Sequence, residues 1–170
     1  MQRFNVPGSN KGFTLLETVT VVAMIGIVSA IAAPSFLSMY SRSKINSATA
    51  EVQGVLQEAQ RQSIRTSKSC TVSVGTTSVT GNCLVSGNLS LNGVTASSSL
   101  SSFQFNHKGL VLDSSAQPFT NPLTLVITAN NSNLKRCLIL TSPLGLIRTG
   151  TYSNSASGTP SATNCTVQNR

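Results

Sequence analysis

The sequence predicts an α+β protein in which one long N-terminal helix carries a head of mostly antiparallel strands. Two observations lead to this prediction. Residues 18–40 hold no charged side chain over 23 positions (40 − 18 + 1), and an apolar stripe at helical spacing continues beyond them. From residue 69 onward the chain instead consists of short β-type segments separated by Gly, Asn, Ser and Pro.

Residues 1–12 form a short polar leader with two basic side chains, Arg3 and Lys11. An ordinary secretory signal has a shorter apolar core, followed by a cleavage site with small residues. Here the apolar run is longer, which does not fit such a signal. We therefore expect the helix to stay in the mature chain.

The uncharged run is long enough to cross roughly 30 Å of hydrocarbon as a helix. A single carboxylate, Glu17, lies at its start. A carboxylate in lipid is costly and usually has both a partner and a task. Pro34 cannot donate a hydrogen bond to the carbonyl of Ala30, so we expect a kink there.

The helix is predicted to continue to about Thr66, giving a length of roughly 80 Å from Phe13 at 1.5 Å per residue. Its apolar stripe recurs in steps of three and four residues: Ile45, Ala48, Val52, Val55 and Ala59. Glu58 is placed to meet Arg61 one turn further on.

The head begins with a predicted strand, residues 70–74, in which the alternating side chains of Cys70, Val72 and Val74 share one face. A turn at residues 80–82 would bring residues 83–85 back antiparallel. Residues 86–102 are rich in Ser, Asn and Gly, and are expected to be a loop that holds one edge strand at most.

Later segments are more strongly apolar. Residues 102–105 and 110–112 flank a hairpin turn, and residues 123–128 and 134–140 are the strongest predicted strands. A turn at Pro143–Gly145 leads into a strand over residues 146–150. The last twenty residues, 151–170, are expected to be loose unless Cys165 holds them.

The four cysteines, Cys70, Cys83, Cys137 and Cys165, all follow the apolar run. An even number of cysteines in an exported domain predicts two disulfides, for which three pairings are possible. We favour Cys70–Cys83 and Cys137–Cys165, because each closes a local loop. A metal site is disfavoured, since there is no Cys-x2-Cys spacing and only one histidine, His107.

The stretch Gly12-Phe-Thr-Leu-Leu-Glu17 resembles the prepilin cleavage and methylation signal of type IV pilins and type II secretion pseudopilins. The resemblance implies that a prepilin peptidase cuts between Gly12 and Phe13 and methylates the new N-terminus. Glu17 then becomes the fifth residue of the mature chain. Pro34 falls where this family commonly has a helix-kinking proline, so Glu17 and Pro34 are the implied assembly residues.

Three further segments resemble the GspH/FimT group of minor pilins and pseudopilins: the helix end Glu58–Arg65, the hairpin Phe105–Gly109 and the late segment Arg136–Gly145. The implied organisation has four parts. They are a cleaved leader (1–12), a transmembrane and assembly half-helix (13–40), an amphipathic half-helix (41–66) and an extracytoplasmic β-rich head (67–170).

The function implied by the resemblance is that of a structural minor pilin or pseudopilin, held in the bacterial inner membrane by a single span with its head outside the cytoplasm. The implied partners are other pilin or pseudopilin subunits, prepilin peptidase, the inner-membrane assembly platform and membrane lipid. Cleavage would lower the formal charge from +8 to +6, because the leader holds two basic residues and no acidic one.

An alternative function is DNA binding by a minor pilin of a competence pilus. Beyond Lys68 the chain has five basic residues against one acidic residue, a net charge of +4, and unopposed cations attract phosphate backbones. Some FimT-like minor pilins bind DNA through a Gly-Arg-x-Arg element, but the corresponding stretch here, Gly145–Arg148, lacks the first arginine. The candidate DNA-binding residues are Lys135, Arg136, Arg148 and Arg170.

Catalysis is not expected. The head contains one carboxylate, Asp113, and one histidine, His107, both in or beside the same predicted hairpin, and no nucleophile-elbow sequence accompanies them. No phosphate-binding glycine loop or calcium-binding acidic cluster is present in the sequence. We therefore predict a protein that is not an enzyme and needs no metal or cofactor.

Overall fold

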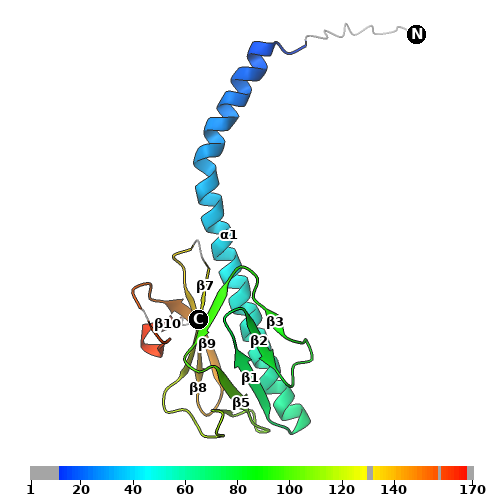
Figure 1. Ribbon diagram of the computed structural model, residues 1–170, viewed down its shortest axis with the longest axis vertical. Helices are drawn as coiled ribbons and strands as arrows, with labels where there is room; N and C mark the ends of the chain where they lie inside the picture. The colour runs from blue at the N-terminus through cyan, green and yellow to red at the C-terminus, as the bar shows by residue number, and fades with distance from the viewer. Residues whose placement is uncertain (1–11, 130–131, 157, 168–170) are drawn as a thin grey trace, which may run out of the picture. The chain divides into compact units, whose positions relative to one another are not determined.

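The computed structural model describes residues 12–129, 132–156 and 158–167, and within the helix the side chains of residues 32–34 are left undescribed. The chain separates into two compact units, Met1–Leu37 and Ser38–Arg170. The second unit is the head, and the last part of the long helix α1 belongs to it (Figure 1).

Helix α1 runs from Leu15 to Thr66, so its C-terminal end is where the sequence predicts it. Within the head, the buried face of α1 follows the predicted stripe, except that Leu56 takes the place of Val55. Leu56 is fully buried and Val55 only half-buried, because the face of α1 that packs on the sheets includes Leu56. The fully or nearly fully buried apolar residues of this face are Ile45, Ala48, Val52, Leu56 and Ala59.

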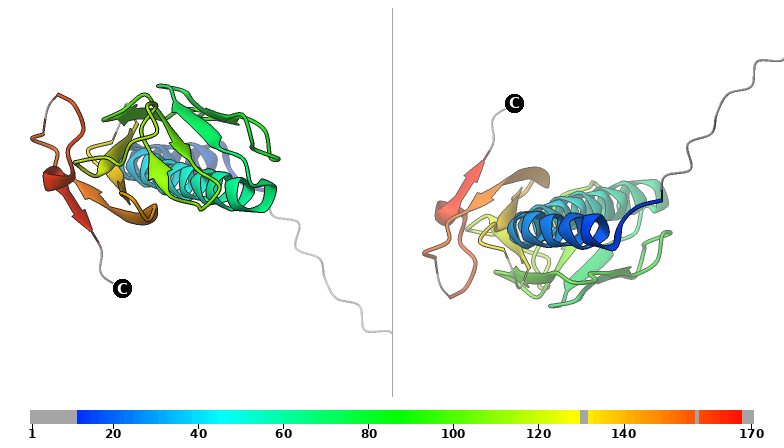
Figure 2. Two further views of the ribbon diagram at one scale, coloured as in Figure 1. Left: turned by 90° about the horizontal axis from the view of Figure 1, so that it is seen from below. Right: turned by 90° about the horizontal axis from the view of Figure 1, so that it is seen from above.

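The head contains two five-stranded antiparallel sheets, which confirms the predicted head of mostly antiparallel strands. The first has the order β3-β2-β1-β5-β6 and the second β10-β9-β8-β7-β4. In the end-on views the two sheets lie on different sides of α1 (Figure 2). The strands of the first sheet are β1 (Cys70–Val74), β2 (Ser78–Gly81), β3 (Leu89–Ser90), β5 (Ser102–Phe105) and β6 (Val111–Leu112). Those of the second are β4 (Thr95–Ser98), β7 (Leu123–Thr128), β8 (Arg136–Thr141), β9 (Leu146–Tyr152) and β10 (Cys165–Val167), preceded by the 3-10 turn η1 (Ala162–Asn164).

The main core lies between α1 and the inner faces of both sheets. Phe103 and Phe105 of β5 are fully buried there, and their rings meet edge to face with centroids 5.8 Å apart. A second, smaller cluster covers the outer face of the second sheet and consists of Val126, Cys137, Ile139, Tyr152 and Cys165. This second cluster holds the C-terminal residues through Val167 against the head, so these residues are not loose.

The first hairpin differs from its prediction. β1 has the predicted alternation, but the chain reverses at residues 75–77, where the amide of Gly75 donates to the carbonyl of Ser78 at 2.8 Å. β2 therefore pairs with β1 through residues 79–81, which include two residues of the turn that the sequence predicts. Residues 83–85 form no strand, and the predicted turn residue Asn82 instead accepts a hydrogen bond from the amide of Thr71.

The loop predicted for residues 86–102 contains two strands. β3 extends the first sheet beyond β2, and β4 pairs with β7 in the second sheet. The remaining predictions are confirmed: β5 and β6 form the expected hairpin, β7 and β8 pair, and β9 follows the turn after Pro143. β9 extends two residues further than predicted, to Tyr152.

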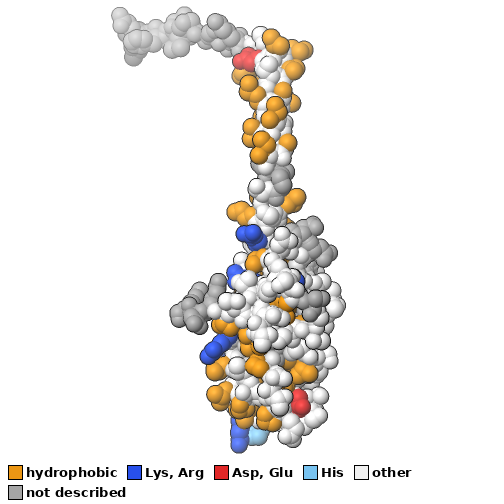
Figure 3. Space-filling view, turned by 90° about the vertical axis from the view of Figure 1, so that its left-hand side faces the viewer, with side chains coloured by type: hydrophobic (Ala, Val, Ile, Leu, Met, Phe, Trp, Pro, Cys, Tyr) orange, Lys and Arg blue, Asp and Glu red, His pale blue; other side chains and the backbone are white. Residues whose placement is uncertain are grey.

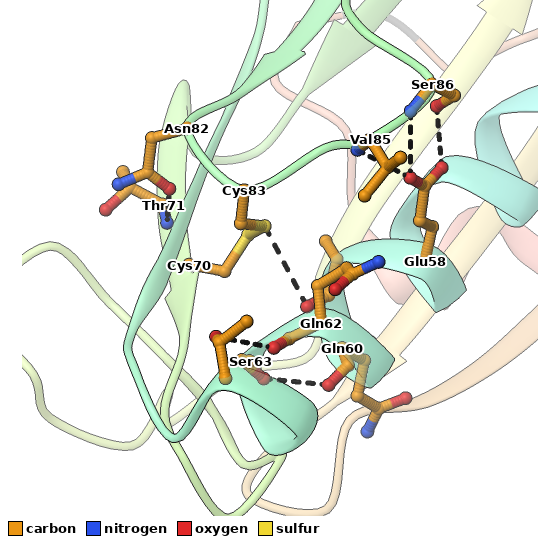
Figure 4. Close-up of a disulfide and its surroundings, with 12 residues drawn as sticks. Glu58, Gln60, Gln62, Ser63, Cys70, Thr71, Asn82, Cys83, Val85 and Ser86 are labelled. Atoms are coloured by element: carbon orange, nitrogen blue, oxygen red, sulfur yellow. Dashed lines mark hydrogen bonds between the residues drawn. A yellow bond between two sulfur atoms is a disulfide. The ribbon is translucent and has the colours of Figure 1, made fainter.

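Both disulfides have the favoured pairing. Cys70 of β1 is joined to Cys83, in the segment after β2, and lies against the last turns of α1 (Figure 4). Cys137 of β8 is joined to Cys165 of β10, with a Cα–Cα distance of 6.0 Å. The second disulfide therefore links the C-terminal strand to the centre of the second sheet.

Candidate functional site

The predicted cleavage site lies in exposed chain without regular secondary structure, directly before α1. Gly12 and Phe13 precede the helix, and the Phe13 side chain is 81% exposed. The carbonyl of Thr14 accepts hydrogen bonds from the amides of Glu17 and Thr18, at 3.1 and 3.2 Å. Its hydroxyl oxygen lies 3.3 Å from the same Glu17 amide, so Thr14 caps the helix. A peptidase would meet an unstructured Gly12–Phe13 bond next to a well-defined helix start.

Glu17 lies in the first turn of α1, where the positive end of the helix dipole favours a carboxylate. Its side chain is exposed. In the mature chain this carboxylate would follow the free amino terminus by four residues. Cleavage would thus leave one acidic and one basic group before the uncharged run of residues 18–40.

The first part of α1 exposes apolar side chains on every face, since neighbouring positions are exposed alike. Figure 3 shows them gathered along this part of the helix. A helix that is apolar all round needs lipid or other helices to cover it. The large apolar residues that are more than half exposed between residues 13 and 40 are Phe13, Leu15, Leu16, Val19, Val21, Val22, Met24, Ile25, Ile27, Val28, Ile31, Phe36, Leu37, Met39 and Tyr40.

Among the described residues, no single unbroken helix is long and apolar enough to cross a membrane, judged by length and composition. Leu15–Ile31 and Ser35–Thr66 meet this criterion only together, as a bent pair. Pro34 falls in the break between them, but its side chain is outside the described residues. Its part in assembly stays a prediction.

The four candidate DNA-binding residues do not form one patch. On β8, Arg136 shares a face with Leu138 and Leu140, and its Nε donates to the Asn46 side chain of α1 at 2.9 Å. Arg148 of β9 is opposite Ile139, so it lies on the other face of the sheet and is exposed. This separation follows from the strict alternation of side chains along a strand.

The other two candidates are Lys135 and Arg170. Lys135 is half-buried, and its ammonium group lies 3.3 Å from the carbonyl oxygen of Asn154. Arg170 lies outside the described residues. Of the three candidates that the structure describes, Arg136 is therefore separated from Arg148 by the second sheet.

His107 and Asp113 do not form a catalytic pair. His107 lies in the turn between β5 and β6, whereas one carboxylate oxygen of Asp113 accepts the amides of Ser115 and Gln117, both at 2.8 Å. Asp113 thus stabilises its own turn. Within the described ranges, no group of three or more His, Cys, Asp and Glu side chains is placed to hold a metal ion.

Glu58 has a structural task that its spacing from Arg61 did not indicate. Its carboxylate accepts the amides of Val85 and Ser86, at 2.8 and 3.0 Å, and the Ser86 hydroxyl at 2.6 Å (Figure 4). These bonds, with that of the Ser86 hydroxyl the strongest, lower the pKa of Glu58, and Arg61 contributes only weakly. Glu58 therefore fastens the segment that carries Cys83 to α1.

Comparison with known proteins gives two kinds of similarity. Residues 8–33 match the family described as the prokaryotic N-terminal methylation motif. The chain is 52% identical over 44 residues to the type IV major pilin protein PilA of Myxococcus xanthus, which covers 26% of this chain and 19% of that protein. It is 40% identical over 52 residues to a fimbrial protein of Pseudomonas aeruginosa, covering 31% of this chain and 34% of that one.

These curated relatives are thus matched over about a fifth to a third of their length. The second similarity is in the fold. The crystal structure of the type IV minor pilin FimU of Pseudomonas aeruginosa superposes with a TM-score of 0.50 at 16% identity, over 68% of this chain and 92% of that one. The long helix packed on antiparallel sheets is therefore the α+β pilin fold.

Proposed function

We propose that this chain, which has the pilin fold and matches the N-terminal methylation motif, is a structural subunit of a type IV pilus or of a related secretion pseudopilus. Within that class we propose a minor pilin or pseudopilin of the GspH/FimT type. Its role is non-enzymatic. It is held in the inner membrane by its first helix before assembly, with the head outside the cytoplasm.

One observation carries the proposal most directly. An exposed Gly12–Phe13 bond is followed by a capped helix whose first turn holds Glu17 and whose next 23 positions are uncharged. Such a helix is covered by lipid in the membrane and by sister helices in a fibre. A merely membrane-anchored protein would have no need of the Gly-Phe junction or of the carboxylate.

The fold similarity to FimU supports a pilin-like head, and the two local disulfides suit an oxidising compartment. The alternative function, DNA binding, has less support. Its best-placed residues, Arg136 and Arg148, lie on opposite faces of the second sheet, and Arg136 is already bonded to Asn46.

The proposal is tested by replacing Gly12. We expect the wild-type chain, produced in cells with a prepilin peptidase, to lose residues 1–12 and to begin with N-methyl-Phe13. Gly12→Ala should keep its leader and remain in the membrane fraction, because the peptidase requires the glycine. Intact-mass and N-terminal peptide mass spectrometry distinguish the two forms.

Gly26→Ala is the matched control. A Cβ at Gly12 or at Gly26 has open space around it, so neither substitution creates a clash within the chain. Only Gly12 adjoins the proposed scissile bond. Normal removal of the leader from Gly12→Ala, or an intact leader in the wild-type chain, would contradict the proposal.

A further inference from the structure

A cavity in the head lies close to the end of the apolar helix run and has no role in the function proposed above. Its volume is about 270 Å³. One wall is the stretch of α1 from Tyr40 to Glu51, and the other is the segment Ser90–Val94 between β3 and β4. All of these residues belong to the second unit.

Lys44 supplies the positive charge of this cavity. Its ammonium group lies over the Tyr40 ring, 5.1 Å from the centroid, and against Gly93, whose missing Cβ would be only 2.9 Å from Nζ. Among the described residues, this ammonium group has no hydrogen-bond acceptor. A lysine held between an aromatic ring and a glycine, with all three donors unused, is suited to receive an anionic oxygen.

The other end of the cavity is acidic. Glu51 lines it two helical turns after Lys44, which places the two Cα atoms about 10 Å apart along the axis. Ser43, Ser47 and Asn92 line the space between them. No hydrogen bond or ion pair involves the Glu51 carboxylate within the described part of the chain. The cavity thus offers a cation, a carboxylate and several neutral polar groups to one ligand.

The place of the cavity at the end of the apolar run indicates which class of ligand it would meet. The uncharged run ends at Tyr40, and the first cations after it are Arg42 and Lys44. Tyrosine and lysine at the end of a membrane helix lie at the depth of the lipid headgroups. The part of the cavity beside Tyr40 would therefore lie at the depth of those headgroups in the membrane-anchored chain.

We propose that this cavity binds a phospholipid headgroup that carries both a phosphate and a primary amine. Lys44 holds the phosphate, the serine hydroxyls contribute further hydrogen bonds to it, and Glu51 accepts the amine. The inference rests on the membrane anchorage proposed above. It adds to that proposal a specific lipid contact, which would hold the membrane-proximal end of the head at the bilayer surface.

The test uses the purified full chain in detergent and native mass spectrometry with phosphatidylethanolamine, phosphatidylglycerol or phosphatidylcholine at equal ratios. We expect at least fivefold greater retention of phosphatidylethanolamine than of the other two lipids. Phosphatidylglycerol has no amine for Glu51, and the quaternary amine of phosphatidylcholine cannot donate a hydrogen bond. Equal retention of the three lipids would overturn the proposal.

Matched variants distinguish lipid binding at this cavity from attraction by surface charge in general. Lys44→Gln should abolish the fivefold preference and Lys44→Arg should retain it, whereas Glu51→Gln should retain phosphatidylethanolamine and phosphatidylglycerol equally. Arg42→Gln removes the same charge two residues away, from a residue that is exposed and does not line the cavity, and should change nothing. Equal losses in Lys44→Gln and Arg42→Gln would reduce the effect to surface electrostatics.

Soluble competitors identify the source of the ligand. Inorganic phosphate and glycerophosphoethanolamine, at the concentration of the lipid, should leave the bound lipid in place; displacement by either would make the site one for a soluble phosphate and overturn the membrane contact. Lipid retention is measured on purified protein, so it does not depend on leader cleavage. A chain that binds the lipid but is never processed would contradict the proposed function alone.

Discussion

At Gly150 of β9 the backbone of β10 passes so closely that a side chain has no room. A Cβ built there would lie 2.8 Å from the carbonyl carbon of Thr166 and 3.0 Å from the Cα of Val167. Gly150 is also opposite Cys137, whose disulfide reaches across to Cys165. The missing side chain is therefore what allows β10 to approach β8 closely enough for the bond.

Gly150→Ala should lower the free energy of unfolding by about 2 kcal/mol, because the clash is with backbone atoms that cannot rotate away. Gly54→Ala is the control. Gly54 is exposed on α1 with open space around its Cβ position, so alanine should raise stability by about 0.5–1 kcal/mol through helix propensity. Urea unfolding of the two variants in the same detergent gives the comparison, and effects of the same sign would contradict this account.

Glu58 is the residue at which charge contributes to the stability of the head. Hydrogen bonds from the Ser86 hydroxyl and amide, and from the Val85 amide, favour the ionised form and lower the pKa of Glu58. A carboxyl group whose pKa is lower in the folded state stabilises that state above its unfolded pKa, about 4.3. This stabilisation is lost as the pH falls below that value.

Glu58→Gln should lower stability by about 1 kcal/mol at pH 7, the magnitude expected for charged hydrogen bonds at a surface. The variant should also lose the part of the decline in stability that protonation of Glu58 causes as the pH falls below about 4.3. Unfolding curves measured across this pH range test both effects. Glu51→Gln is the control, because it replaces a carboxylate of the same helix that makes no such bonds, and an equal loss of stability at pH 7 in the two variants would contradict this account.

At the scale of elements, α1 could be predicted from sequence because its signals are local. The apolar spacing that buries Ile45, Val52 and Ala59 is a property of consecutive residues, and the helix ends at Thr66 as predicted. The choice of Leu56 over Val55 depends on which face meets the sheets. That choice is made by packing, which the spacing alone does not settle.

Strands β2, β3 and β4 were harder to predict, because their sequence signals are weak and do not show which segments pair. The first reversal uses Gly75, whereas Gly81 and Asn82 offered an equally good turn sequence. β3 is only two residues long, and β4, with the sequence Thr-Ala-Ser-Ser, has little β propensity of its own. β4 exists because β7, about thirty residues later, offers an edge to pair with.

The candidate sites divide in the same way. The Gly12–Glu17 segment is contiguous, so its motif could be recognised from sequence alone. The cavity beside Tyr40 could not, because it joins α1 to Asn92 across more than forty residues. The separation of Arg136 from Arg148 likewise depends on strand register, which places them on opposite faces of the sheet.

At the scale of the whole molecule, the two units differ in how much of their own apolar surface they bury. The head buries its own, in one large cluster and one small cluster. The first unit exposes most of its large apolar side chains, and Glu17 is the single charged residue of its described part. The apolar surface of the first unit is therefore covered only when lipid or other helices surround it.

Within a bundle of such helices, Glu17 of one subunit would lie in a medium of low dielectric constant. An unpaired carboxylate there is strongly unfavourable, and the amine that the proposed processing would create at Phe13 of a neighbouring subunit would neutralise it. The pair forms only when the two helices have the correct axial offset. Glu17 would thus select the register of assembly, while the apolar surface supplies most of the contact area.

Glu17→Ala should therefore be processed normally but enter fibres at least about tenfold less efficiently, a difference of about 1.4 kcal/mol or more per subunit. Immunoblots of sheared fibres and of membrane fractions give the ratio, and mass spectrometry of the membrane pool confirms that the leader is gone. Thr20→Ala, one turn further along the same helix, removes a hydroxyl that bonds only to the Glu17 carbonyl and should assemble as the wild type does. If Glu17→Ala and Thr20→Ala entered fibres equally well, the apolar surface alone would set the register and the carboxylate would have no part in assembly.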